Sequence, residues 1–223
     1  MKCLNNILSI GPQCARLLVF SSIIALLGSD LVVAQSRDAD AIMLSLRTKY
    51  DTMVSLSATF DQTTSSEFMD TEDHFHGDIL IQGDAYRIEM TGQTIVSNAN
   101  LTWIHNKSEN QVLINNYVYD ETTFSLSRFL SEFDTAYSVQ SFERTPDGPT
   151  VVLIPNDEFS SFLSVQMWIR KSDSIVFRLR VIDINDVEMM FDLSNIVFNP
   201  TVPSGSFLFV TPDGVEEIDL REN

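Results

Sequence analysis

Hydrophobic and polar residues alternate along residues 73–105, DHFHGDILIQGDAYRIEMTGQTIVSNANLTWIH. Successive residues of a strand point to opposite faces, so this spacing predicts strands that share one apolar face and one polar face. Turn-forming pairs, such as Gly83-Asp84 and Gly92-Gln93, separate the runs, and connections this short require antiparallel neighbours. The apolar positions are Ile79 and Ile81, then Tyr86, Ile88 and Met90, then Leu101 and Trp103.

The same alternation continues on both sides of this meander. A first strand begins at Leu56 and runs through Phe60 into the polar segment 62–67. Further strands are predicted over residues 111–118, 137–144, 150–154, 163–169, 175–181, 187–193 and 207–210. The chain therefore predicts ten or eleven antiparallel strands.

Two segments have helical spacing instead. Residues 38–53 carry Ile42, Leu46 and Tyr50 on one stripe, with Asp38 or Asp40 available as the N-cap.

The second helical segment, residues 126–133, has apolar residues at i, i+3, i+4 and i+7, after Thr122 or Thr123 as a cap. A third helical turn is possible over 157–162. The apolar residues of the second segment are Leu126, Phe129, Leu130 and Phe133.

A sheet of this many strands must curl or close, which predicts a mainly β (α+β) fold. With two or three short helices as a lid, a cavity is expected under them. The helix residues Ile42, Leu46, Tyr50, Leu126, Phe129, Leu130 and Phe133 would form the lid. The expected lining is Phe60, Ile79, Ile81, Tyr86, Ile88, Met90, Trp103, Met167, Ile169, Phe177, Leu179, Met189 and Phe191. The alternative is an ordinary β-core that the protein fills with its own side chains.

Residues 1–34 have the composition of a secretory signal peptide. Lys2 and Arg16 precede an apolar segment, residues 17–27, and cleavage is expected after Ala34. Both cysteines, Cys3 and Cys14, lie in this leader. The predicted mature protein, residues 35–223, is one exported, soluble domain without cysteine.

The chain is strongly acidic, with a formal net charge of −17, or −18 without the leader. Such a surface repels nucleic acid and anionic lipid headgroups, so neither is expected as a partner. A salt-rich habitat would also select this charge.

Little in the chain indicates catalysis or cofactor binding. His74 and His76 share a strand face near acidic residues, but no third ligand follows at a recognisable spacing, which favours a solvated strand end over a metal site. No nucleophile motif or phosphate-binding glycine loop is present. We expect a binding protein with no metal and no cofactor.

Several short segments, in order, carry a family resemblance. These are SATFDQ at 57–62, GDIL at 77–80, YRIEM at 86–90, IVSN at 95–98 and LTWI at 101–104, followed by FLF at 207–209, PDGV at 212–215 and the pair Ile218-Asp219. In this order they resemble the LolA family of periplasmic outer-membrane lipoprotein carrier proteins.

The resemblance implies an unclosed antiparallel barrel whose lidded cavity shelters the acyl chains of lipoproteins. It implies a periplasmic monomer that receives cargo from an inner-membrane ATP-driven lipoprotein-releasing complex and delivers it to an outer-membrane acceptor. One position departs from the family: Gln82-Gly83 stands where an arginine and a proline help to hold the lid shut.

Two other functions remain open at this point. A periplasmic lipid- or lipoprotein-sensing regulatory domain would use the same architecture, although such a sensor is usually attached to a membrane. A structural lipid-binding protein tied to the outer membrane would need the lipidation cysteine that this chain lacks.

Overall fold

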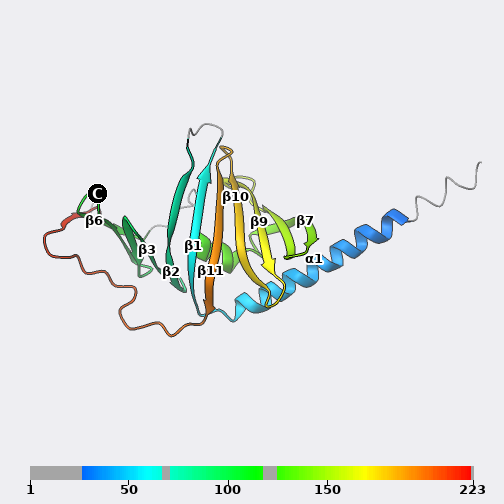
Figure 1. Ribbon diagram of the computed structural model, residues 1–223, viewed down its shortest axis with the longest axis horizontal. Coiled ribbons are helices and arrows are strands. Elements are labelled where there is room, and N and C mark those ends of the chain that lie inside the picture. Colours follow the sequence, from blue (N-terminus) through cyan, green and yellow to red (C-terminus); the bar gives the residue numbers. More distant parts are fainter. Residues whose placement is uncertain (1–26, 67–70, 118–124, 222–223) are drawn as a thin grey trace, which may run out of the picture. The chain divides into compact units, whose positions relative to one another are not determined.

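A computed structural model describes residues 27–66, 71–117 and 125–221 (Figure 1). These ranges contain two helices, α1 (Leu27–Asp51) and α2 (Leu126–Glu132), and twelve strands. The strands are β1 (Ser55–Ser65), β2 (Asp73–Gln82), β3 (Ala85–Met90), β4 (Gln93–Ser97), β5 (Leu101–Asn106), β6 (Gln111–Asn116), β7 (Tyr137–Thr145), β8 (Gly148–Pro155), β9 (Phe162–Arg170), β10 (Ile175–Asp183), β11 (Glu188–Phe198) and β12 (Glu216–Asp219).

The chain divides into two compact units, residues 1–38 and 39–223. The described part of the first unit is the beginning of α1. The second unit contains the rest of α1, the sheet and α2, and all packing described below belongs to it. None of the described helices is long and apolar enough to cross a membrane.

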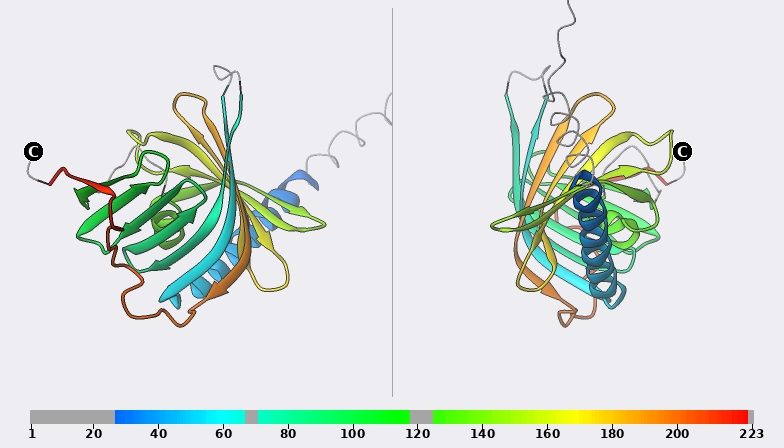
Figure 2. Two further views of the ribbon diagram at one scale, coloured as in Figure 1. Left: turned by 60° about the vertical axis from the view of Figure 1, so that its left-hand side comes forward. Right: turned by 90° about the vertical axis from the view of Figure 1, so that its right-hand side faces the viewer.

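All twelve strands form one sheet in the order β12-β6-β5-β4-β3-β2-β1-β11-β10-β9-β8-β7. The predicted mainly β fold with an unclosed sheet and few helices is confirmed. Register shifts where β11 pairs with β1, β7 with β8 and β10 with β9 are β-bulges, which bend a strand and increase its twist. The sheet curls as a result, and we call its concave face the inner face (Figure 2).

The chain order explains why a helix lies on the inner face. Strand β6 pairs near one end of the sheet and β7 forms the other end, so the connection between them must cross from one end to the other. Helix α2 is in that connection, and its three apolar residues and its C-cap residue Phe133 belong to the main hydrophobic cluster. The lid position of α2 is therefore a consequence of topology.

The structure differs from five local predictions. Residues 207–210 form no strand, and the last strand is β12, which pairs with β6 in parallel rather than antiparallel. Helix α1 begins at Leu27, well before residue 38. The N-cap of α2 is Ser125, whose side chain accepts a hydrogen bond from Arg128 N, while Thr122 and Thr123 lie outside the described residues. Residues 157–162 contain a turn and no helix.

The segment 199–215, which we call the C-terminal strap, runs over the outer face of the sheet before it becomes β12. Arg87 Nη1 donates to Ser206 O at 3.3 Å, and the rings of His105 and Phe209 are 5.6 Å apart. Beneath it, Val96 and Val112 are fully buried but do not belong to the main cluster. Strands β4–β6 therefore bury apolar side chains on the outer face, under the strap, as well as carrying apolar side chains on the inner face.

Tyr50 anchors α1 to the sheet. Its ring packs edge-on against Phe133 and Phe198 at 5.8 and 5.2 Å, and its Oη accepts a hydrogen bond from Val176 N at 3.3 Å. Burial raises the pKa of the Tyr50 hydroxyl far above its ordinary value of 10.0. The folded protein therefore keeps this proton at a pH where the unfolded chain loses it.

This difference predicts a pH dependence of stability. The contribution of Tyr50 is fully present below pH 10 and falls above it, by about 1.4 kcal/mol of unfolding free energy per pH unit. Urea unfolding of the wild type and Tyr50→Phe between pH 8 and pH 11 measures it. The variant should show a shallower alkaline decline, with Tyr117→Phe as the control; equal slopes for Tyr50→Phe and wild type would contradict the prediction.

Candidate functional site: the inner face of the sheet

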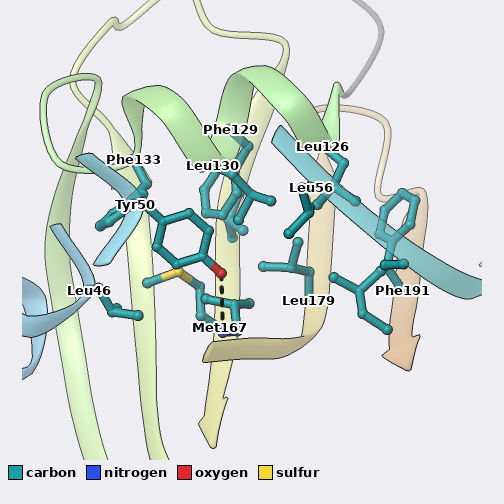
Figure 3. Packing of buried hydrophobic residues seen from close by; sticks show 14 of the residues in the cluster. Leu46, Tyr50, Leu56, Leu126, Phe129, Leu130, Phe133, Met167, Leu179 and Phe191 are labelled. Carbon is teal, nitrogen blue, oxygen red and sulfur yellow. Dashed lines mark hydrogen bonds between the residues drawn. The ribbon is translucent and has the colours of Figure 1, made fainter. Parts of the chain in front are cut away.

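One half of the inner face is filled by the protein itself. Side chains of α2 point towards Leu56, Met167 and Leu179, and Tyr50 closes the side near α1 (Figure 3). Met167 and Leu179 have no exposed surface. In this conformation the half formed by β1 and β8–β11 is a close-packed core, where an added chain would have to displace existing side chains.

The predicted lid residues all lie at this core. Leu46, Tyr50, Leu126, Phe129, Leu130 and Phe133 are buried in the cluster, and Ile42 packs partly buried against it. Four predicted cavity residues are buried within the same core rather than lining an empty space: Met167, Ile169, Leu179 and Phe191. Phe60, Ile79 and Ile81 are buried beside them, and Met189 is partly buried.

The other half of the inner face is partly open. Here β3–β6 present a continuous set of apolar side chains, each neither buried nor fully exposed. The members are Tyr86, Ile88, Met90, Ile95, Ile104 and Leu113. A half-exposed apolar surface on a hydrogen-bonded sheet is a suitable place for an apolar ligand. We call these six residues the open inner face.

The structure places two predicted cavity residues elsewhere. Trp103 pairs with Val96, on the opposite face from Ile88, so it lies under the strap side of the sheet. In β10 the bulge between Val176 and Arg178 reverses the alternation, so Val176 takes the inner position and Phe177 does not join the cluster.

Sequence reasoning missed Ile95, Ile104 and Leu113. Strands β4–β6 have apolar residues at adjacent positions, as in Ile95-Val96 and Trp103-Ile104, so alternation alone cannot say which of each pair points inward. The available signal was the strap: its Phe207-Leu208-Phe209 segment could cover the second apolar face.

A pocket of about 480 Å³ borders the packed core. It lies between the end of α1, α2 and the β2–β3 turn, and its apolar wall contains Tyr50, Ile81, Leu130 and Phe133. Tyr117 also lines it. Its charged lining residues are Arg47, Asp51, Asp84, Arg128, Glu132 and Asp134. The pocket thus combines an apolar wall with charges of both signs.

One ion pair at this pocket connects the two helical segments. Arg47 Nε of α1 lies 3.1 Å from Oδ2 of Asp134, which follows α2. The Arg47 side chain is 55% exposed, and exposed pairs contribute about 0–1 kcal/mol. Packing of Phe133 and Leu130 therefore holds α2 more firmly than this pair. Gly83, at the position where the family resemblance implies a proline, also lines the pocket.

The polar contact at the open inner face joins two uncharged side chains, Tyr86 and Thr102. Burial raises the pKa of the Tyr86 hydroxyl, which hydrogen-bonds with the side chain of Thr102, so Tyr86 is neutral near pH 7. Elsewhere, His76 Nδ1 lies 2.7 Å from Asp61 Oδ1 at an exposed position, and His74 contacts Thr63. Among the described residues, no group of three His, Cys, Asp or Glu side chains could hold a metal ion.

Comparison with known proteins bears on this arrangement. Residues 51–210 match the family model described as outer membrane lipoprotein carrier protein LolA. The chain belongs to the LolA family. The resemblance expected from the sequence is confirmed, and the match includes most of the sheet and α2. The strand β12 of this LolA family member lies beyond the matched residues.

Among solved structures the likeness is one of fold. An uncharacterized conserved protein from Thermus thermophilus is 12% identical, with a TM-score of 0.52 over 82% of this chain and 99% of that chain. A LolA superfamily protein from Nitrosomonas europaea is 14% identical, with a TM-score of 0.42 over 76% and 96%. LprF from Mycobacterium bovis is 11% identical, with a TM-score of 0.44 over 76% and 97%. The search of curated proteins found no match.

Proposed function

We propose that this LolA family member is a periplasmic chaperone that binds the acyl chains of lipoproteins and carries them from the inner to the outer membrane. The observation that supports the proposal is the open inner face, a half-exposed apolar surface on a rigid sheet beside a helical lid. Each methylene removed from water contributes about 0.8 kcal/mol, so a long acyl chain needs such a surface to cross an aqueous compartment.

The two halves of the inner face have different parts in this proposal. The close-packed half supplies the stability that a carrier with an open apolar surface needs. The open half binds cargo, and the pocket beside α2 borders the packed half. Deeper entry of a chain requires α2 to move, so the lid competes with cargo for the same apolar surface.

The remaining parts of the proposal concern processing and partners. We propose that residues 1–34 are removed as a signal peptide and that residues 35–223 act as one monomeric, soluble domain. Acylated lipoproteins are the cargo, an inner-membrane ATP-driven releasing complex is the donor, and an outer-membrane acceptor receives them. The function is binding, without catalysis, metal or cofactor.

Titration with a fluorescent fatty-acid probe tests binding. We expect saturable binding that an acylated lipoprotein peptide competes away. Ile104→Asp places a charge in the middle of the open inner face and should weaken binding about tenfold or more, because the carboxylate resists losing its water. Ile154→Asp, at an outward position on β8 that is 37% exposed, is the matched control.

Two results would contradict the proposal. The first is the absence of saturable binding by the wild type. The second is an equal loss in both aspartate variants. The carrier step needs its own assay, in which the purified protein releases a lipoprotein from inner-membrane vesicles that contain the ATP-driven complex.

A further inference from the structure

The register of the sheet aligns one apolar residue per strand into a row that crosses the strands. Ile79 pairs with Ile88, which pairs with Ile95, and each next strand adds one directly opposite partner. Residues directly opposite each other lie on the same face. The row, which we call the apolar row, consists of Ile79, Ile88, Ile95, Ile104, Leu113 and Ile218.

Polar side chains border the apolar row on both sides across β4–β6. On one side, Ser97 of β4 is opposite Thr102 of β5, which is opposite Asn115 of β6. These residues are uncharged, and each lies two positions from a member of the row.

The other border is formed in the same way by Gln93, Asn106 and Gln111. Between the two borders the apolar surface is one side chain wide. A second alkyl chain beside the first would cover the half-buried amides of Gln93, Asn106, Gln111 and Asn115, which costs free energy when these groups lose water without a new partner.

The length of the row fits one long alkyl chain. Neighbouring strands lie about 4.8 Å apart, so the five steps from Ile79 to Ile218 span about 24 Å. With carbon–carbon bonds of about 1.5 Å, an extended chain advances about 1.25 Å per carbon, and about 18 to 20 carbons have this length.

The two ends of the row differ. Ile79 is 7% exposed and lies against Ala58 and Phe60 of the packed core, which leaves no place for a polar head. Ile218 lies on β12 at the end of the sheet order, between the exposed residues Glu217 and Asp219. A head group, or a protein attached to it, can remain in water only at this end.

We propose that the apolar row binds a single alkyl chain lying across the strands, with its methyl end at Ile79 and its polar head at the β12 edge. This inference rests on the proposed function and specifies it: one chain at a time, in one direction. It also assigns a role to β12, which extends the row by one strand through Ile218, beyond the residues that match the family.

The proposal is tested by combining alkyl probes of two lengths with substitutions at different positions along the apolar row. The probes are lysophosphatidylcholines of about 10 and about 18 carbons, measured by calorimetry below their micelle concentrations with the full-length protein. The head stays at β12, so the short chain reaches only as far as Ile104, while the long chain also covers Ile88. We expect the affinity to increase about two- to fourfold per methylene.

Threonine keeps the branched shape of a strand residue but adds a hydroxyl, so it interrupts the row with little effect on folding. Leu113→Thr should weaken both probes about three- to tenfold. Ile88→Thr should weaken only the long probe. Ile154→Thr on β8 should weaken neither, and if Ile88→Thr fails to fold, Ile95→Thr replaces it.

The outcomes separate this proposal from the one on which it rests. If the wild type binds neither probe, the proposed function itself is wrong. If both probes bind but Ile88→Thr and Leu113→Thr act equally on both lengths, the function stands and the row is overturned. If Ile88→Thr weakens both probes and Leu113→Thr only the long one, the proposed direction is wrong.

Discussion

Replacing Phe133 with alanine is expected to lower the free energy of unfolding by about 3–5 kcal/mol. The Phe133 side chain is 2% exposed, and its ring lies 5.8 Å from that of Tyr50 and 6.3 Å from that of Phe129. Its removal would leave a cavity where α1 and α2 meet the sheet. Urea denaturation of the wild type and the variant gives the difference.

The matched control is Phe159→Ala. Phe159 lies in a turn and is 86% exposed, so the same truncation there should change stability by less than about 0.5 kcal/mol. A loss of less than about 1 kcal/mol for Phe133→Ala would show that α2 is not packed on the core in solution. In that case the filled half of the inner face would be available to cargo without any movement of the lid.

Gly77→Ala should have the second large effect, a loss of about 3 kcal/mol or more. Gly77 occupies an inner position on β2, between Phe60 and Met90 of the neighbouring strands. An added Cβ would lie 2.3 Å from Glu89 O and 3.1 Å from Phe60 Cε1. The carbonyl belongs to the backbone of β3, so relief requires the strand itself to move.

Gly92→Ala is the control for this substitution. A Cβ at Gly92 meets nothing within 4 Å, and we expect a change of less than about 0.5 kcal/mol. Thermal unfolding of both variants measures the contrast. Equal stability of the two variants would mean that β2 and β3 have room to separate at Gly77, and the close contact of Phe60 and Met90 around it would not be a fixed part of the inner face.

The two halves of the inner face bear on a conflict that the proposed carrier function raises. An empty apolar cavity costs stability, because its walls lose packing contacts. Here α2 and Tyr50 fill the half formed by β1 and β8–β11, while β3–β6 keep their apolar side chains half-exposed. Only the second half then carries the cost of an uncovered apolar surface.

Much of the candidate site could be read from local pattern. Tyr86, Ile88 and Met90 alternate with charged residues, so the inner face of β3 was unambiguous. The stripe Leu126, Phe129, Leu130 and Phe133 likewise identified the face of α2 that is buried. In both elements only one face is apolar, so the spacing of the apolar residues alone decides which side chains are covered.

The alternation of apolar and polar residues gave wrong inward positions where both faces of a strand are apolar or where a bulge interrupts the alternation. Trp103 and Ile104 are adjacent in β5, and the strap buries apolar residues on the outer face as well. Phe177 follows a regular alternation in sequence, but the bulge after Val176 inserts one residue and turns it away. A one-residue shift moves a side chain to the other face of a sheet.

The sequence by itself determined the mainly β architecture, the two lid segments and the family. The spacing of apolar side chains and the short turns depend only on residues close together in the chain. Only the tertiary structure decided that α2 fills half of the inner face, that the strap covers the outer face, and that six strands align the apolar row. These features depend on which distant strands pair and in which register, and the pairing energy of a strand depends on the whole sheet rather than on the strand alone.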